Sequence, residues 1–330
     1  MGATSKTVVI DNLTTATWYS IKDVLVDQVF TITPWYNRMF EKGRINAKVP
    51  DGSHWEVPIQ YAKQDQNLQW FGRGTLFGTA EKESMTRLLW YTRNLANSVV
   101  RYWDDDRKNR GRAKLLDYVN TIVTNAKDSL IDKLETCSLA QDSDPDAMDA
   151  LETLISTTPT SGSVGGQTRS AGTPYFINQT KDFSALTMAG SLLDEMTSMW
   201  NKCSEFKGGG KPQTPDIILT TRLVYEGYEK VARNLQTIQT NKTERVSLGF
   251  GDLMFKNAEL FYSPSCPAGR MYFLNSATIE FVYDPAAWMD MTEWKPLEGR
   301  SLDRTAQIVC VCNQTCSHFQ KNGVIFNINS

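Results

Sequence analysis

The stretch INAKVPDGSHWEVPI, residues 45–59, decides how the fold of this chain is interpreted. Two short runs, residues 44–49 and 54–59, flank Pro50-Asp51-Gly52. Proline presets the φ angle of a turn and glycine tolerates a positive φ, so the pattern predicts a β-hairpin. Polar side chains interrupt the apolar face of both arms, and a two-stranded hairpin is only marginally stable alone in water. We therefore expect an arm that becomes ordered by lying on a neighbouring copy of the same protein.

The composition is that of an ordinary globular protein, and 330 residues allow one large core or two moderate ones. The net charge is −2, from 35 basic and 37 acidic side chains, so the basic excess typical of a nucleic-acid groove is missing. Only weak or indirect contact with DNA is expected. Neither a membrane-length apolar run nor the apolar core of a signal peptide is found, which predicts no membrane partner. Six scattered cysteines predict reduced thiols in a cytoplasmic setting.

Apolar periodicity and turn residues predict the remaining elements. Ahead of the hairpin, helical stretches at residues 18–30 and 35–41, the second closed by Gly43, form a docking arm. After it, a strand at residues 98–103 precedes a helix at about residues 107–139, long enough to act as a strut. Residues 157–173, rich in Ser, Thr and Gly, are predicted to be a flexible connection. The later elements are a helix at 184–203, a strand at 216–219, a helix at 223–236, strands at 253–255, 259–262, 271–274 and 278–283, and a closing pair of strands at 306–312 and 319–328.

One group of residues has the chemistry of a zinc site: Cys310, Cys312, Cys316 and His318. If residues 313–315 turn a hairpin, three thiolates and an imidazole project from one face. The spacing is not that of a common zinc module, and the alternative is that Cys310 and Cys312 act as small hydrophobic residues on an inward strand face. We favour the second interpretation and expect neither a metal nor another cofactor.

Charged residues change sign at the start of the long helix, where Asp104, Asp105 and Asp106 precede Arg107, Arg110 and Arg112. Acids at a helix N-terminus are favoured by the helix dipole and need no divalent cation. The basic residues suit contact with phosphate, and a self-complementary change of sign suits packing between subunits equally well. The chain has only two histidines, His54 and His318, which leaves little scope for histidine-dependent catalysis. The glycine run at residues 208–210 lacks the pattern of a nucleotide-binding loop. We therefore do not expect an enzyme.

The order of these features resembles the major capsid proteins of tailed double-stranded DNA bacteriophages, which have the Hong Kong 97-like fold. The passages that carry the resemblance are PDIILTTRLVYEGYEKV at residues 215–231, FKNAELFYSPSCPAGRMYFLN at 255–275, and the ending from TIEFVYDP at 278–285 to NGVIFNI at 322–328. The resemblance implies an α+β fold with five parts. These are an N-terminal arm (1–43), an extended β-hairpin loop (44–78), a peripheral domain (79–149) with its spine helix, an axial α/β domain (150–274), and a return to the peripheral domain (275–330).

The resemblance also implies a function. Such a chain self-assembles into hexamers and pentamers of an icosahedral shell around phage DNA, in the host cytoplasm during assembly and afterwards in the virion. Some relatives carry an N-terminal scaffolding segment, which is absent here because the arm begins at Met1. The resemblance therefore implies a separate scaffolding protein or none, and we expect a separate one, together with a portal. Trp55, Trp70 and Phe71 are the expected interface anchors, because large aromatic side chains dominate interface energetics. The alternatives are a tail-tube or decoration protein, or a two-domain α/β enzyme.

Overall fold

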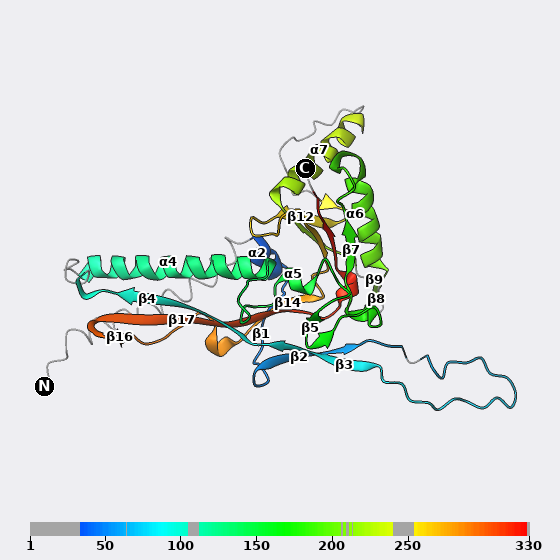
Figure 1. Cartoon of the computed structure of the whole chain (residues 1–330), viewed down its shortest axis with the longest axis horizontal. Coiled ribbons are helices and arrows are strands. Elements are labelled where there is room, and N and C mark those ends of the chain that lie inside the picture. The colour runs from blue at the N-terminus through cyan, green and yellow to red at the C-terminus, as the bar shows by residue number, and fades with distance from the viewer. Residues whose placement is uncertain are drawn as a thin grey trace.

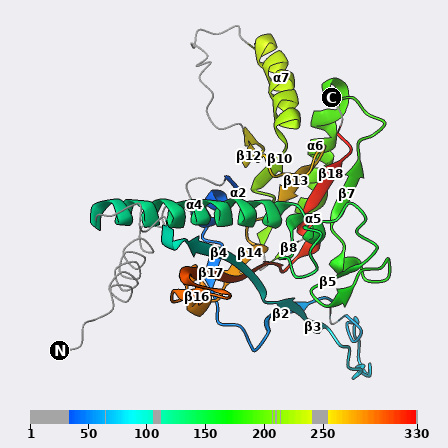
Figure 2. The same ribbon diagram turned by 60° about the vertical axis from the view of Figure 1, so that its left-hand side comes forward.

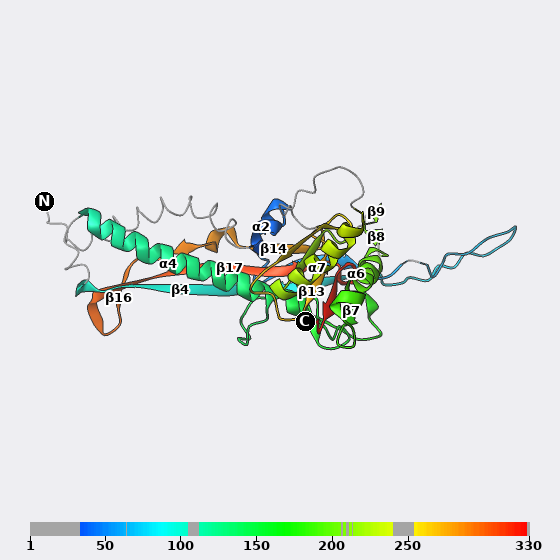
Figure 3. The same ribbon diagram turned by 90° about the horizontal axis from the view of Figure 1, so that it is seen from above.

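The computed structural model describes residues 34–63, 65–104, 112–205, 207–208, 211–212, 214–239 and 254–328. These residues form three parts (Figure 1). An elongated part is built on one long helix and one long strand, a compact part holds a second sheet with its helices, and a thin arm extends beyond the compact part. Seen from above, the long helix and the arm point to opposite ends of a flat subunit (Figure 3). No helix among the described residues is long and apolar enough to cross a membrane.

The elongated part packs helix α4 (Arg112–Leu139) against strands β4 (Arg93–Arg101) and β17 (Arg300–Cys316), as Figures 1 and 2 show. At 1.5 Å per residue the helix spans about 42 Å, so its apolar face needs a partner of similar length. The 17-residue strand β17 supplies it, because alternate side chains of a strand share one face. Its inward residues pack with the buried face of α4 in one cluster, which includes Val123, Leu130, Leu134, Ala306, Ile308, Cys310 and Cys312.

The sheet of this part contains six strands. β1 (Ile45–Ala47), β14 (Ile279–Tyr283), β17 and β15 (Asp290–Met291) follow in that order, while β16 (Lys295–Leu297) and β4 also pair with β17. Almost all of these pairings are antiparallel, but β1 runs parallel to β14.

The compact part has a second six-stranded sheet in the order β11 (Met254–Phe255), β12 (Ala258–Tyr262), β10 (Ile217–Thr220), β13 (Met271–Leu274), β18 (Gly323–Phe326) and β7 (Gln179–Asp182). All four residues of β10 and of β13 are buried, because both sheet faces are covered. One face packs with α6 (Met188–Ser204) and α7 (Arg222–Gln239). The other packs with α5 (Leu151–Leu154) and the base of the arm.

Shorter elements complete the described chain. They are α2 (Pro34–Glu41), the pairs β2 (His54–Gln60) with β3 (Met85–Tyr91), β5 (Ser163–Val164) with β6 (Gln167–Thr168) and β8 (Lys207–Gly208) with β9 (Lys211–Pro212), and the 3-10 turns η1 (Pro174–Phe176), η2 (Pro285–Ala287) and η3 (Phe319–Lys321).

The hairpin predicted around residues 50–52 is wrong in its pairing. The turn exists, with Gly52 at a φ of +70°, but it is a corner between two sheets. The strand before the turn, β1, pairs with β14, and the strand after it, β2, pairs with β3. Burial explains the choice, because the β2–β3 register sets Trp55 opposite Trp90 in the core, whereas the two predicted arms have no shared apolar face.

Three further expectations are corrected. The two closing strands do not pair, because β17 lies in the elongated part whereas β18 lies between β13 and β7 in the compact part. The return of residues 275–330 to the peripheral domain is therefore incomplete. Residues 157–173 contain the β5–β6 hairpin, so they are not simply a flexible connection. The predicted helix at residues 18–30 and the residues 107–111 that should begin the long helix lie outside the described residues.

Candidate assembly surfaces

The extended loop is the hairpin of β2 and β3 together with the residues that join them. Its base belongs to the subunit core, since Trp55 is 5% exposed and its indole Nε1 donates a hydrogen bond to the Lys48 carbonyl over 2.8 Å. The expectation that Trp55 anchors a neighbouring subunit is therefore wrong. This tryptophan is used inside its own subunit, where Trp90 and Leu88 of β3 join the same cluster.

A second hairpin fixes the base of the loop. The Leu89 amide of β3 donates to the Gly165 carbonyl over 2.9 Å, at the turn between β5 and β6. Gly165 has a φ of +54°, and a Cβ there would lie 3.0 Å from Leu88 Cδ2. Gln167 adds a hydrogen bond from its side chain to the Arg87 carbonyl. Because only glycine fits this conformation and this approach, the β5–β6 turn sets the direction in which the loop leaves the body.

The tip of the loop, residues 65–81, is exposed along its whole length. Its own side chains tie the two arms together. Asn67 forms two hydrogen bonds with the backbone of Ala80, and Gln69 donates to the Leu76 carbonyl over 2.7 Å. Gly72 is the twelfth residue after the end of β2, so at ~3.3 Å per residue the tip reaches at most about 40 Å beyond the strand.

Large apolar side chains gather on this tip. Exposed fractions are 100% for Trp70, 72% for Phe71 and 62% for Phe77, and the two phenylalanine rings lie 5.3 Å apart. Leu68 and Leu76 are more than four-fifths exposed. Trp70 and Phe71 were predicted from the sequence and the other three were not, although five large apolar residues within the ten-residue run 68–77 of a polar segment are a detectable signal. Clusters of this kind mark sites of protein–protein contact.

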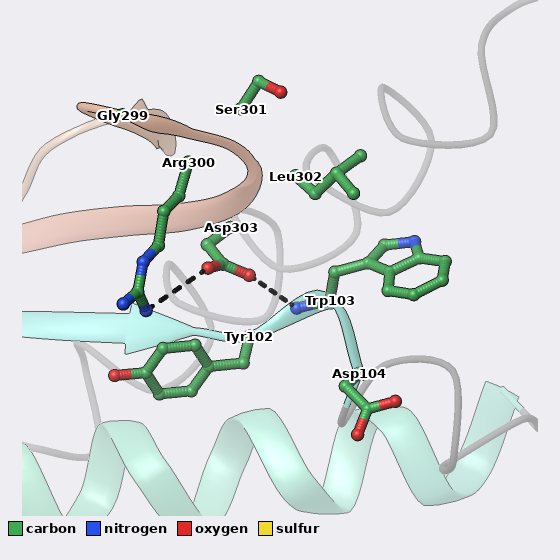
Figure 4. A pocket seen from close by; sticks show the side chains of 8 residues that line it. All are labelled: Tyr102, Trp103, Asp104, Gly299, Arg300, Ser301, Leu302 and Asp303. Carbon is green, nitrogen blue, oxygen red and sulfur yellow. Dashed lines mark hydrogen bonds and ion pairs between the residues drawn. The ribbon is translucent and has the colours of Figure 1, made fainter.

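A hollow of about 620 Å³ lies where β4 ends beside the turn from β16 to β17 (Figure 4), at the end of the subunit opposite the loop (Figure 1). Tyr102, Trp103 and Leu302 line it and are 46%, 47% and 64% exposed. Asp303 accepts a hydrogen bond from the Trp103 amide over 3.0 Å and lies 4.0 Å from the Arg300 guanidinium (Figure 4). The hollow therefore combines apolar side chains with fixed charge.

Six charged residues were predicted to change sign at the start of the long helix. The structure places one of them, Asp104, in the lining of this hollow. Asp105, Asp106, Arg107 and Arg110 lie outside the described residues, and Arg112 begins α4 without a described side chain.

The residues of the possible zinc site do not converge. Residues 313–315 continue β17, so the prediction of a turn there, on which the site depends, is wrong. Cys310 and Cys312 face α4 in one core cluster, whereas Cys316 belongs to another. Burial raises the pKa of Cys310 to about 11 and that of Cys316 to about 12. Among the described residues no group of three or more His, Cys, Asp or Glu side chains is placed to hold a metal ion.

Comparison of three-dimensional structures identifies the fold. The capsid asymmetric unit of cyanophage A-1(L) superposes with a TM-score of 0.62 at 15% identity, covering 87% of this chain and 91% of that one. Mycobacterium phage Bobi gives 0.55 at 10%, covering 87% and 90%. The SrpI encapsulin complex of Synechococcus elongatus gives 0.52 at 9%, covering 91% and 89%. No family model and no curated protein matches the sequence.

These similarities confirm the predicted fold. The chain has the Hong Kong 97-like architecture of tailed-phage major capsid proteins, with helices and sheets arranged as an α+β subunit. An encapsulin shares the architecture.

Proposed function

We propose that this chain is the major capsid protein of a tailed double-stranded DNA bacteriophage and self-assembles into the icosahedral shell that encloses the phage genome. The observation that carries the proposal, on a fold found in shell proteins, is the exposed apolar tip of the extended loop. A subunit that stayed monomeric would keep Trp70, Phe71 and Phe77 in water, and contiguous apolar patches of this kind mark contact surfaces. The role is structural and needs no catalytic residue or cofactor.

The contact that we propose joins opposite ends of neighbouring subunits. Trp70 and Phe71 are its anchors, and they dock beside the hollow that Tyr102 and Trp103 line on the next copy. The exposed Arg73 at the tip is matched by two acidic side chains in that hollow, Asp104 and Asp303, against one basic side chain, Arg300. A contact between two different surfaces of identical subunits is heterologous, and it closes into rings when the rotation between neighbours allows. Hexamers and pentamers are such rings.

The remaining partners follow from the proposed role. A separate scaffolding protein and a portal take part in assembly in the host cytoplasm, and the finished shell belongs to the virion. A net charge of −2 suits contact with packaged DNA that is weak and not sequence-specific. A tail-tube protein, a decoration protein or an α/β enzyme would not account for a capsid-type fold that ends in an apolar arm.

The structure defines a sharper test than removal of the whole predicted loop. Deleting residues 46–69 would also remove Trp55 from the core and would damage folding. Replacing residues 68–79 by Asn-Gly instead keeps the Asn67–Ala80 pair and closes it with a favoured two-residue turn. We expect the shortened chain to fold with an unchanged circular dichroism spectrum but to form no shells in electron micrographs.

A second variant separates the length of the arm from its chemistry. It keeps the full loop and replaces its five large apolar residues by serine, namely Leu68, Trp70, Phe71, Leu76 and Phe77. Assembly should fail here too, because the anchors are lost although the reach is unchanged. Normal shells from both variants would contradict the proposed contact. Compact monomers from the unaltered chain under all conditions would contradict the proposed function itself.

A further inference from the structure

Helix α2 lies where α4 meets the sheet of the compact part (Figures 1 and 3). Its Trp35, Tyr36 and Met39 side chains are at most 3% exposed. The helix is only eight residues long, so its order comes from these contacts and not from helix propensity. It therefore acts as a strap within the subunit, in addition to the docking role expected for the N-terminal arm.

The second half of α2 and the residue after it are held to the compact part by ion pairs. The Arg38 guanidinium lies 3.5 Å from the Glu259 carboxylate of β12 and 5.7 Å from the centre of the Phe261 ring. Lys42, just after the helix, lies 3.6 Å from Asp216, the residue before β10. These groups are partly exposed, so each pair contributes little by itself.

The first half of α2 is held by one buried carboxyl group, that of Glu135 on α4. Its Oε1 atom accepts hydrogen bonds from the Trp35 amide over 3.2 Å and from the Ser263 hydroxyl over 3.1 Å. Ser263 directly follows β12, so a single oxygen joins α2, α4 and the compact part. Beside it, the Tyr36 hydroxyl donates to the Leu134 carbonyl over 3.2 Å. Glu135 is 4% exposed, and its Oε2 atom has no hydrogen-bond partner among the described residues.

We propose that the protonation state of Glu135 controls this strap. The neutral carboxyl group holds α2 closed against α4 and the compact part, and loss of the proton loosens this contact. The geometry carries the inference. Burying an ionised carboxylate costs far more than burying a neutral one, and here one of its two oxygens has no donor to offset that cost. The proposal does not depend on the function proposed above.

The sign of the effect follows from the groups around Glu135. Burial raises its pKa from 4.5 to about 7, although the hydrogen bonds from Trp35 and Ser263 act to lower it, and the charge of Asp132 on the same helix also acts to raise it. The Tyr36 phenol of α2 also titrates nearby, with a pKa raised by burial. The closed strap therefore binds a proton that the open strap releases. The contribution of this proton to the stability of the closed strap is fully present below pH 4.5, decreases as the pH rises, and levels off above pH 7.

Hydrogen exchange of residues 34–43 tests the proposal in the full chain. With a pKa of about 7 closed and 4.5 open, the opening equilibrium increases about tenfold between pH 6 and pH 8. The Glu135→Gln variant keeps an acceptor but cannot ionise, so its opening should not change with pH. Dividing the wild-type exchange rate by that of the variant at each pH cancels the intrinsic chemistry of exchange. This ratio should rise about tenfold, whereas a constant ratio overturns the proposal.

Two more variants complete the experiment. Asp128→Asn changes an exposed acid on the same helix and should leave the wild-type pH dependence intact. Ser263→Ala removes a hydrogen bond that lowers the pKa of Glu135, so it should move the midpoint of the dependence upward, which a purely structural role would not do. If Glu135→Gln fails to fold, the wild-type rates divided by those of a free peptide of residues 34–43 provide the same ratio, and a constant ratio again overturns the proposal.

Discussion

Replacing Trp70 by alanine separates assembly from folding more cleanly than other single changes in the loop. Its side chain is 100% exposed in the isolated subunit, so no contact within the subunit is lost. Substitutions at such positions change folding stability by no more than about 0.5 kcal/mol. Any larger effect of Trp70→Ala must therefore arise where the tip meets another molecule.

The size of that effect can be estimated from the area that becomes buried. A tryptophan at an interface buries about 150–250 Å², which at about 25 cal/mol per Å² sets an upper limit of roughly 4–6 kcal/mol. Ordering the tip and losing translational freedom reduce this value, and truncation of a central aromatic anchor costs about 2–4 kcal/mol in practice. Each subunit contributes one tip, so a loss of about 2 kcal/mol raises the subunit concentration needed for assembly about thirtyfold.

The assay measures free subunits in equilibrium with shells by sedimentation, alongside urea denaturation of the unassembled chain. Leu223→Ala is the matched control, because this residue in the first turn of α7 is 49% exposed and lies away from the loop. Trp55→Ala should show the opposite pattern, with about 3–5 kcal/mol lost from the free energy of unfolding, because its ring is buried. An unchanged assembly threshold for Trp70→Ala would refute the assignment of the tip as the contact surface.

Three further predictions concern the body of the subunit, each checked by urea denaturation. Gly165→Ala should lower the free energy of unfolding by about 2 kcal/mol, because the φ of +54° is strained for alanine and the new Cβ crowds Leu88. Gly162→Ala is the control: its φ is +84° but its Cβ would lie in open space, so it should lower the free energy of unfolding by only about 1 kcal/mol. Gln314→Leu should raise it by about 1–2 kcal/mol, because both amide atoms are buried without a partner among the described residues; a decrease would contradict this. Burial lowers the pKa of His318 from 6.5 to about 4, so stability present above pH 6.5 should fall by roughly 2 kcal/mol, after allowance for partial exposure, as the pH drops from 6.5 to 4. His318→Gln should remove that fall, and its persistence would exclude the histidine as the cause.

Elements with a strong local period were predicted well from the sequence. The long helix, the helix that became α6 and the strands β10 to β14 each carry their own apolar pattern and turn residues, so local information is sufficient. The identity of the fold followed from the order of these elements, since that order is preserved even where the residues differ, as 15% identity to the cyanophage subunit illustrates.

Strand pairing was predicted poorly because it depends on residues far apart in the chain. The corner at Gly52 has the local signals of a hairpin, and nothing within residues 44–59 indicates that Trp55 will find its partner at Trp90. The same reason explains the error at residues 313–315. Asn313 favours a turn locally, but the side chains of residues 313–315 are buried inside the continuous strand β17, where Asn313 donates hydrogen bonds to Tyr91 and Asp149.

The buried carboxyl group of Glu135 could not be predicted from the sequence either. On a helix wheel it is one acid among several, and its environment is created by Trp35 and Ser263, which are 100 and 128 residues away. The apolar cluster of the tip could be predicted from the sequence, because its residues lie close together in the chain and do not depend on contacts with distant residues.

The contrast between the base and the tip of the loop favours assembly on physical grounds. Strands in a hairpin are usually joined by two to five residues, yet residues 61–84 join β2 to β3. The five large apolar side chains on that connection contribute little to the stability of the isolated subunit, so most of the free energy of burying them is gained only on contact with another molecule. A loosely attached arm would lose much of that energy as entropy on binding. Here the Gly165 contact and the burial of Trp55 fix the base in advance, which limits the directions in which the tip is presented and lowers the entropic cost of docking.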